Sequence, residues 1–189
     1  MDIFSHGFWG GLIFGKNKRL LYWAVLFSIL PDMIAFAPLL LFALTGDLPL
    51  GSRPEAMSEY PRIVLTLYSI THSMVIILPI YFLVRVLDRE LSFAFLAWPM
   101  HILFDIPTHT GKYFPTPFLY PISDFTISGI SWSNPYFMLA NYTAIISITL
   151  FLVAKRGRFP GVSHLKKRLF SFRNISNQSS NTRDPRSNS

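Results

Sequence analysis

The chain has 189 residues, of which 51% are hydrophobic and only 14% are charged, and it contains no cysteine. This composition excludes an ordinary water-soluble domain, and the lack of cysteine excludes disulfides, thiolate metal sites and cysteine nucleophiles. The net charge of +7 comes from short basic runs beside apolar segments and from the C-terminal tail, a pattern typical of membrane orientation rather than of nucleic-acid binding.

The first apolar segment, residues 2–15, is roughly 14 residues long, whereas a full membrane span needs about 20. We therefore expect a half-span or interfacial helix here. Gly7, Gly10 and Gly11 would let another helix approach this one closely. The segment has no positive region before it, so no cleavable signal peptide is expected. A basic turn at residues 16–19 follows.

Four longer apolar segments follow, and each is a candidate transmembrane helix: residues 20–44, 62–86, 91–106 and 136–154. Proline predicts a kink at Pro31, a break near Pro99 and a helix end at Pro107. Residues 45–61 form a polar loop. Residues 112–135 form a loop rich in aromatic residues, proline and serine, whose length favours a lid or an interfacial loop over a simple connection.

These segments predict an all-α fold, a polytopic helical membrane bundle with one short N-terminal half-span helix and about four transmembrane helices. Residues 1–155 would form this membrane domain. Residues 156–189 would form a basic, disordered tail, because they are rich in serine, asparagine and arginine. The lysine and arginine bias places the tail in the cytoplasm. The bilayer is the expected partner, nucleic acid is not, and the oligomeric state stays open.

Six ionisable side chains lie within or at the ends of the apolar segments: His6, Asp32, His72, His101, Asp105 and His109. Ionisable groups at membrane depth are costly and usually face a protein interior or a cavity, so they predict a functional site. Histidine and aspartate are also good ligands for hard or borderline divalent metals, and this set therefore predicts an intramembrane metal site.

The helical rise of about 1.5 Å per residue allows the depths of these groups to be compared. His6 precedes the basic turn by nearly as many residues as Asp32 follows it, so an antiparallel hairpin brings the two level. His72 and His101 each lie about ten residues into their segments, from opposite faces, and so reach mid-depth. Asp105 shares one helix face with His101 because they are four residues apart.

Several roles stay open at this stage. His109, at the mouth of its segment, could complete the site, bind a second ion or move protons, or it could be solvated. Asp32 could instead cap a helix that restarts after Pro31. His72 could be a packing histidine, and His6 could lie at the headgroup interface. His101 and Asp105 could form a satisfied buried pair. Tyr68 and Thr71 are candidates to hold the His72 ring.

The motifs together resemble the YdjM-like family, which is described as membrane-bound, metal-dependent hydrolases of bacterial and archaeal inner membranes. The resemblance covers residues 1–109 and rests on the following elements: Asp2-Ile3-Phe4-Ser5-His6 with Gly10, Leu30-Pro31-Asp32, Thr71-His72-Ser73, His101 to Asp105, and Pro107-Thr108-His109. The family often has an acidic residue soon after its Leu-Pro-Asp element. Here Met33, Ile34 and Ala35 follow instead, so any role of that acid is absent.

The order of the motifs is also similar, more distantly, to zinc-dependent phospholipase C and related single-strand nucleases. That likeness implies one ion held by four residues: Asp32, His72, His101 and Asp105. It further implies a second ion shared by His6 and Asp105, with the amino end of Met1 as a further ligand, while His109 serves another ion or the substrate side. The second HxxxE motif of those enzymes is missing, so a third ion is not expected.

The expected function is therefore an integral membrane hydrolase that uses metal-activated water on a lipid ester or phosphodiester. The expected cofactor is a divalent metal, zinc first, as one or two ions. Asp32 and Asp105 are the expected catalytic carboxylates, and all six ionisable residues are expected metal ligands. The bacterial or archaeal plasma membrane is the expected location. A metal-ion transporter and a non-catalytic membrane scaffold are the alternatives.

Overall fold

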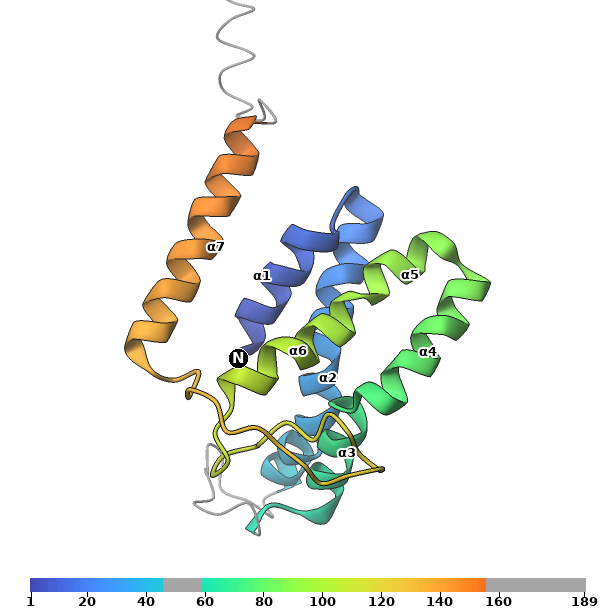
Figure 1. The fold of residues 1–189 in the computed structure, drawn as a ribbon, viewed down its shortest axis with the longest axis vertical. Coiled ribbons are helices and arrows are strands. Elements are labelled where there is room, and N and C mark those ends of the chain that lie inside the picture. The colour runs from blue at the N-terminus through green and yellow to red at the C-terminus, as the bar shows by residue number, and fades with distance from the viewer. Residues whose placement is uncertain (46–58, 156–189) are drawn as a thin grey trace, which may run out of the picture. The chain divides into compact units, whose positions relative to one another are not determined.

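The computed structural model describes residues 1–45 and 59–155, and these residues form helices and no strand. The helices are α1 (Ile3–Phe14), α2 (Lys18–Thr45), α3 (Arg62–Thr71), α4 (Met74–Leu87), α5 (Arg89–Phe95), α6 (Ala97–Thr108) and α7 (Pro135–Lys155) (Figure 1). The all-α prediction is confirmed. The predicted tail, residues 156–189, and most of the predicted polar loop lie outside the described residues.

Three helical stretches are long and apolar enough to cross a membrane: α2, α5 with α6, and α7. If the bent pair α3 and α4 is counted as one span, the described residues contain up to four candidate membrane spans. Helix α1 is apolar but shorter. Large apolar side chains point outward from these helices; Tyr22, Phe82 and Leu139, for example, are 75%, 63% and 69% exposed. Such surfaces suit lipid rather than water, so the helices are compatible with a membrane protein.

Inter-residue contacts divide the chain after Ile145, and the site described below lies within residues 1–145. The described part of the second unit is the C-terminal half of α7, which carries exposed apolar side chains such as Leu150 and Phe151. Within the first unit, α2 is the central helix, because it contacts α1, α3, α5 and α6.

The predicted hairpin of the first two segments is present, with α1 lying against α2 (Figure 1). Gly10 is the point of closest approach: a Cβ atom there would lie 2.6 Å from Ser28 Cβ and 2.8 Å from the Ala24 carbonyl oxygen. Ser28 Oγ donates a hydrogen bond of 2.5 Å to the carbonyl of His6. A small residue at position 10 is therefore required for this contact.

The third apolar segment is not one helix, which corrects the sequence prediction. It breaks at His72 and Ser73, and α3 and α4 meet there with a bend of 53°. Ser73 caps α4 by accepting a hydrogen bond from the Ile76 amide, 3.2 Å long. The Met74 amide, left without a helical partner, donates to the Phe118 carbonyl at 2.9 Å. A distant loop thus stabilises the break.

The fourth apolar segment breaks at Leu96 rather than at Pro99. Pro99 instead lies in the first turn of α6, where the missing amide proton needs no helical partner. The helix also continues past Pro107 to Thr108, one residue beyond the predicted stop. Pro31, where a kink is predicted, lies inside α2.

The loop between α6 and α7 is held against the end of α6 by backbone hydrogen bonds. The amides of Gly129, Ile130 and Trp132 donate to the carbonyls of His109, Pro107 and Thr108, at 2.7, 2.9 and 2.9 Å. Tyr68 Oη donates to the Phe114 carbonyl at 2.8 Å, which ties the loop to α3 as well. The loop therefore covers the region where α3 and α6 end.

Candidate metal centre

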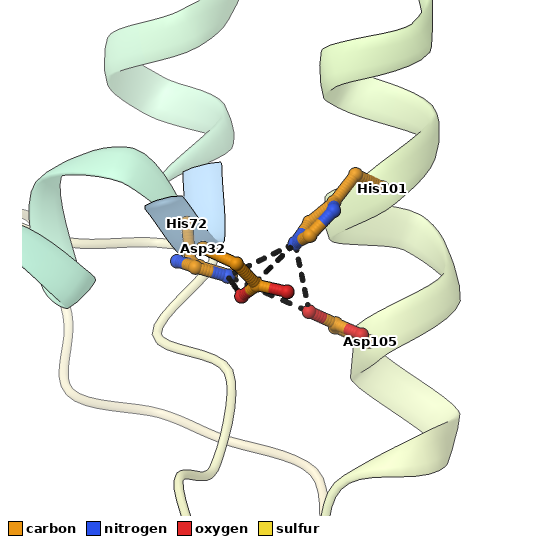
Figure 2. A group of neighbouring side chains, drawn as sticks. All are labelled: Asp32, His72, His101 and Asp105. Atoms are coloured by element: carbon orange, nitrogen blue, oxygen red, sulfur yellow. Dashed lines mark hydrogen bonds and ion pairs between the residues drawn. The ribbon is translucent and has the colours of Figure 1, made fainter. Parts of the chain in front are cut away.

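Four of the six predicted site residues meet in one buried group: Asp32, His72, His101 and Asp105. One ligand atom from each lies within 4.8 Å of all the others. Asp32 comes from α2, His72 from the break between α3 and α4, and the other two from α6 (Figure 2). Their geometry is that of a group that could hold one metal ion.

The His72 ring is oriented by groups at the end of α3. Its Nδ1 lies 3.1 Å from the Tyr68 carbonyl oxygen and 3.0 Å from Thr71 Oγ1. A carbonyl oxygen only accepts, so Nδ1 carries a proton, and in the neutral ring Nε2 carries the lone pair. The Tyr68 ring stacks on the imidazole with centroids 4.0 Å apart. These contacts aim Nε2 of His72 into the group.

The His101 ring is oriented in the same way by a different helix. Its Nδ1 lies 2.7 Å from the backbone carbonyl oxygen of Ser28 in α2. Because this carbonyl also only accepts, Nδ1 of His101 is the protonated nitrogen. The Nε2 atoms of His101 and His72 lie 3.1 Å apart in two fully buried rings, and each carries a lone pair when its ring is neutral.

The two carboxylates complete the group. Asp32 Oδ1 lies 3.4 Å from His72 Nε2 and 3.7 Å from His101 Nε2. Asp105 Oδ2 lies 3.5 Å and 3.1 Å from the same two atoms. Asp105 is fully buried, and its Oδ2 receives no hydrogen bond from the described residues. With both rings neutral, four electron-pair donors lie within 4.8 Å of one another.

A positive charge at its centre would stabilise such an arrangement. Lone pairs at these distances repel one another, and burial removes the water that would otherwise screen them. A proton on one imidazole would satisfy one contact, whereas a metal ion would contact all four atoms. Neutral imidazoles fixed by carbonyl oxygens and paired with carboxylates are also the usual ligands of zinc-class ions.

The remaining two predicted residues lie beside the other oxygen of Asp105. His6 Nε2 is 2.9 Å from Oδ1, and the His6 ring stacks on His101 with centroids 3.6 Å apart. His109 Nδ1 is 3.8 Å from the same oxygen. The amino group of Met1 forms an ion pair with Oδ1 and donates to Thr108 Oγ1 at 3.0 Å. The two oxygens of Asp105 therefore face different partners.

His109 follows the last residue of α6 and lies close to the Thr116 hydroxyl, with 3.4 Å between Nδ1 and Oγ1. Burial lowers the pKa of His109 to about 4, against the opposing effect of Asp105. The ring is therefore neutral at pH 7, and an open cavity reaches it.

That cavity, here called the main cavity, has a volume of about 530 Å³ and opens to the surface. Asp32, His109 and Tyr68 line its inner end, so the metal centre borders it. Aromatic side chains form most of the remaining wall: Phe36, Tyr60, Tyr113, Phe114 and Trp132. Asp32 keeps 14% of its side chain exposed, whereas His72, His101 and Asp105 are closed off.

These positions decide several of the alternatives that the sequence left open. Asp32 lies inside an unbroken α2, so it caps no helix restarting after Pro31. The predicted convergence of Asp32, His72, His101 and Asp105 is confirmed as geometry. Thr71 holds the His72 ring through its hydroxyl, and Tyr68 holds it through its carbonyl. Sequence reasoning missed Ser28, which acts through its backbone carbonyl, a group that every residue carries.

Comparisons with protein-family models, with curated proteins and with solved structures found no match to this chain.

Proposed function

We propose that this protein is an integral membrane metal-dependent hydrolase that cleaves a lipid ester or phosphodiester. The observation that carries the proposal is the buried group of two imidazole nitrogens, 3.1 Å apart, and two carboxylates beside an open and largely apolar cavity. A bound divalent ion of the zinc class would lower the pKa of water and polarise a substrate oxygen.

The chain's own residues have distinct roles in this proposal. Asp32 is the one member of the group that also lines the main cavity, so its carboxylate orients the attacking water and takes its proton. Asp105 holds the His6 ring with Oδ1, and its Oδ2, 3.1 Å from His101 Nε2, is the oxygen that would bind the ion. His72 and His101 are ligands through Nε2.

The residues that line the main cavity favour a lipid-like substrate. Its inner end carries polar groups, and its wall includes apolar residues of α1 and α2 such as Phe4, Phe36 and Leu39. Phe4 is 72% exposed, so the cavity is continuous with a surface suited to acyl chains. An amphiphile fits this combination better than a polar metabolite does.

We also propose that the protein belongs to the YdjM-like family. In this proposal it lies in a bacterial or archaeal inner membrane, with the C-terminal tail in the cytoplasm. The basic residues beside the helix ends support that orientation. Lys16, Lys18 and Arg19 lie at the turn between α1 and α2, and Arg85 and Arg89 lie at the turn between α4 and α5.

A transporter would need ligands along a path to both faces. Among the described residues, the four-residue group is the one cluster of three or more ligands that could hold an ion. This favours a resident metal over a translocated one. Metal flux into liposomes that depends on His101 would instead favour transport.

The test is hydrolysis of a short-chain phospholipid in mixed micelles by the full-length, zinc-loaded protein. Removing the Asp32 base should lower turnover by about 100-fold or more. Asp32→Asn keeps the shape of the side chain, and Asp124→Asn is the matched control, because Asp124 is exposed in the loop before α7. Equal turnover in the wild type and Asp32→Asn would refute this role, and a wild type without metal-dependent turnover would refute the hydrolase.

A further inference from the structure

A second cavity of about 280 Å³ adjoins the main cavity. We call it the side cavity, and three residues line both: His109, Tyr113 and Trp132. None of the four metal-centre residues lines the side cavity. A group bound there would lie next to the metal centre without touching its ligands.

The side cavity differs from the main cavity in charge. Lys112 is the one cationic side chain among the described residues that line it, and none of them is acidic. By contrast, the main cavity is lined by the carboxylates of Asp2 and Asp32, and the amino group of Met1, which also lines it, is already paired with Asp105. An anion would therefore bind in the side cavity and avoid the main one.

Hydrogen-bond donors line the same cavity as Lys112. Hydroxyl groups line the cavity at Thr110, Ser131 and Ser133, and the last two lie 2.8 Å apart, Oγ to Oγ. Trp132 adds an indole to the same wall. A lysine ammonium with several hydroxyl donors suits the oxygens of a phosphate group.

The side cavity lies near the membrane surface and the main cavity reaches deeper, in the order of the headgroup and the acyl esters of a lipid. The side cavity is lined by residues just past Thr108, where the membrane-length stretch Arg89–Thr108 ends, and headgroups lie at such helix ends. The main cavity also reaches Asp32, which lies about 21 Å along α2 from Lys18 and is therefore deeper in the membrane than Thr108.

We propose that the side cavity binds the phosphate headgroup of a phospholipid, so that the bond presented to the metal centre is an acyl ester. This inference rests on the hydrolase function proposed above and narrows its substrate. With the phosphate held by Lys112, the ester groups of the glycerol would lie deeper in the membrane, beside His109 and Asp32. Water adds to the ester carbonyl carbon, and the bond from that carbon to the glycerol oxygen breaks. The fatty acid leaves, and the glycerol oxygen takes a proton.

Binding to the full-length protein in detergent tests the headgroup site, with dihexanoyl phosphatidic acid, dihexanoylglycerol and inorganic phosphate as probes in titration calorimetry. Phosphatidic acid should bind about tenfold more tightly than dihexanoylglycerol, the difference expected for one hydrogen-bonded charge. Lys112→Ala should abolish this preference and Lys112→Arg should retain it. Lys18→Ala, an exposed lysine at the start of α2, is the matched control and should bind like the wild type.

Unchanged preference in Lys112→Ala would overturn the headgroup site. Inorganic phosphate binding as tightly as phosphatidic acid would also overturn it, because the ligand would then be free phosphate. Release of fatty acid from phosphatidic acid supports the ester assignment, whereas release of inorganic phosphate contradicts it. Metal content measured on the same samples separates the two proposals: a Lys112-dependent preference in protein that binds no metal would leave the headgroup site standing and refute the hydrolase.

Discussion

Two groups at the end of α3 orient the His72 ring: the Thr71 hydroxyl and the Tyr68 carbonyl. The hydroxyl can be removed by substitution with little change in the shape of the site. Thr71 Oγ1 lies 3.0 Å from His72 Nδ1, and the Tyr68 carbonyl supplies the second contact. Contacts of this kind orient a ligand and raise its basicity. Thr71 is buried and Val has nearly its shape, so Thr71→Val isolates the hydroxyl.

We expect Thr71→Val to weaken zinc binding by about tenfold, the lower end of the range for partners of this kind, because the Tyr68 carbonyl remains. Titration against a competing chelator measures the affinity. Thr143→Val is the matched control, since Thr143 is exposed on α7. If Thr71→Val and Thr143→Val bind zinc equally well, the hydroxyl has no part in holding the ring.

The residues of the candidate site could be predicted from sequence, because histidine and aspartate are costly within apolar segments and default to a functional role there. The ring tautomers could not be predicted. Those of His72 and His101 depend on the carbonyls of Tyr68 and Ser28, and a backbone carbonyl leaves no trace in a sequence. The roles of His6 and His109 stay predictions, and the structure places both beside Asp105 Oδ1.

Helix α1 reaches the site only because it packs directly on α2. Gly10 permits this approach, and the same contact lets Ser28 bond to the His6 carbonyl while its own carbonyl holds His101. A Cβ at Gly7 would be far less crowded, with its nearest neighbour, Ile29 Cγ2, at 3.2 Å. The two glycines therefore form a matched pair on one helix.

We expect Gly10→Ala to destabilise the protein by about 1–3 kcal/mol, because the new methyl group would meet the Ala24 backbone and Ser28. Gly7→Ala should be neutral or slightly stabilising, since alanine favours the helix and the Ile29 side chain can move. Thermal unfolding in detergent measures both. A Gly10→Ala protein as stable as Gly7→Ala would contradict the close packing of α1 on α2.

The helices were largely predictable, because long apolar runs bounded by charged turns leave little choice. The break at His72 was not. Thr71, His72 and Ser73 interrupt the apolar run through residues 62–86 at the break. However, the partner that satisfies the Met74 amide, Phe118, lies far along the chain. Local patterns cannot show a contact of that range. The break matters because it brings His72 to the end of a helix, where its ring can face Asp32.

The molecule as a whole places one polar centre inside an apolar bundle. Asp32 lies about 21 Å along α2 from Lys18, and His101 lies about 18 Å along its stretch from Arg89. Both starting points are at basic turns, so the two ligands reach one depth from the same side. The main cavity is lined by residues farther along α2, and it therefore opens away from these turns.

The central claim is that this buried group holds a metal ion, and elemental analysis of the full-length protein purified in detergent tests it most directly. We expect the wild type and Asp124→Asn to carry at least one transition-metal ion per chain. His101→Ala and Asp105→Ala should lose that ion, because each removes a buried ligand. A wild type without stoichiometric metal, or equal metal in all four proteins, would contradict the claim.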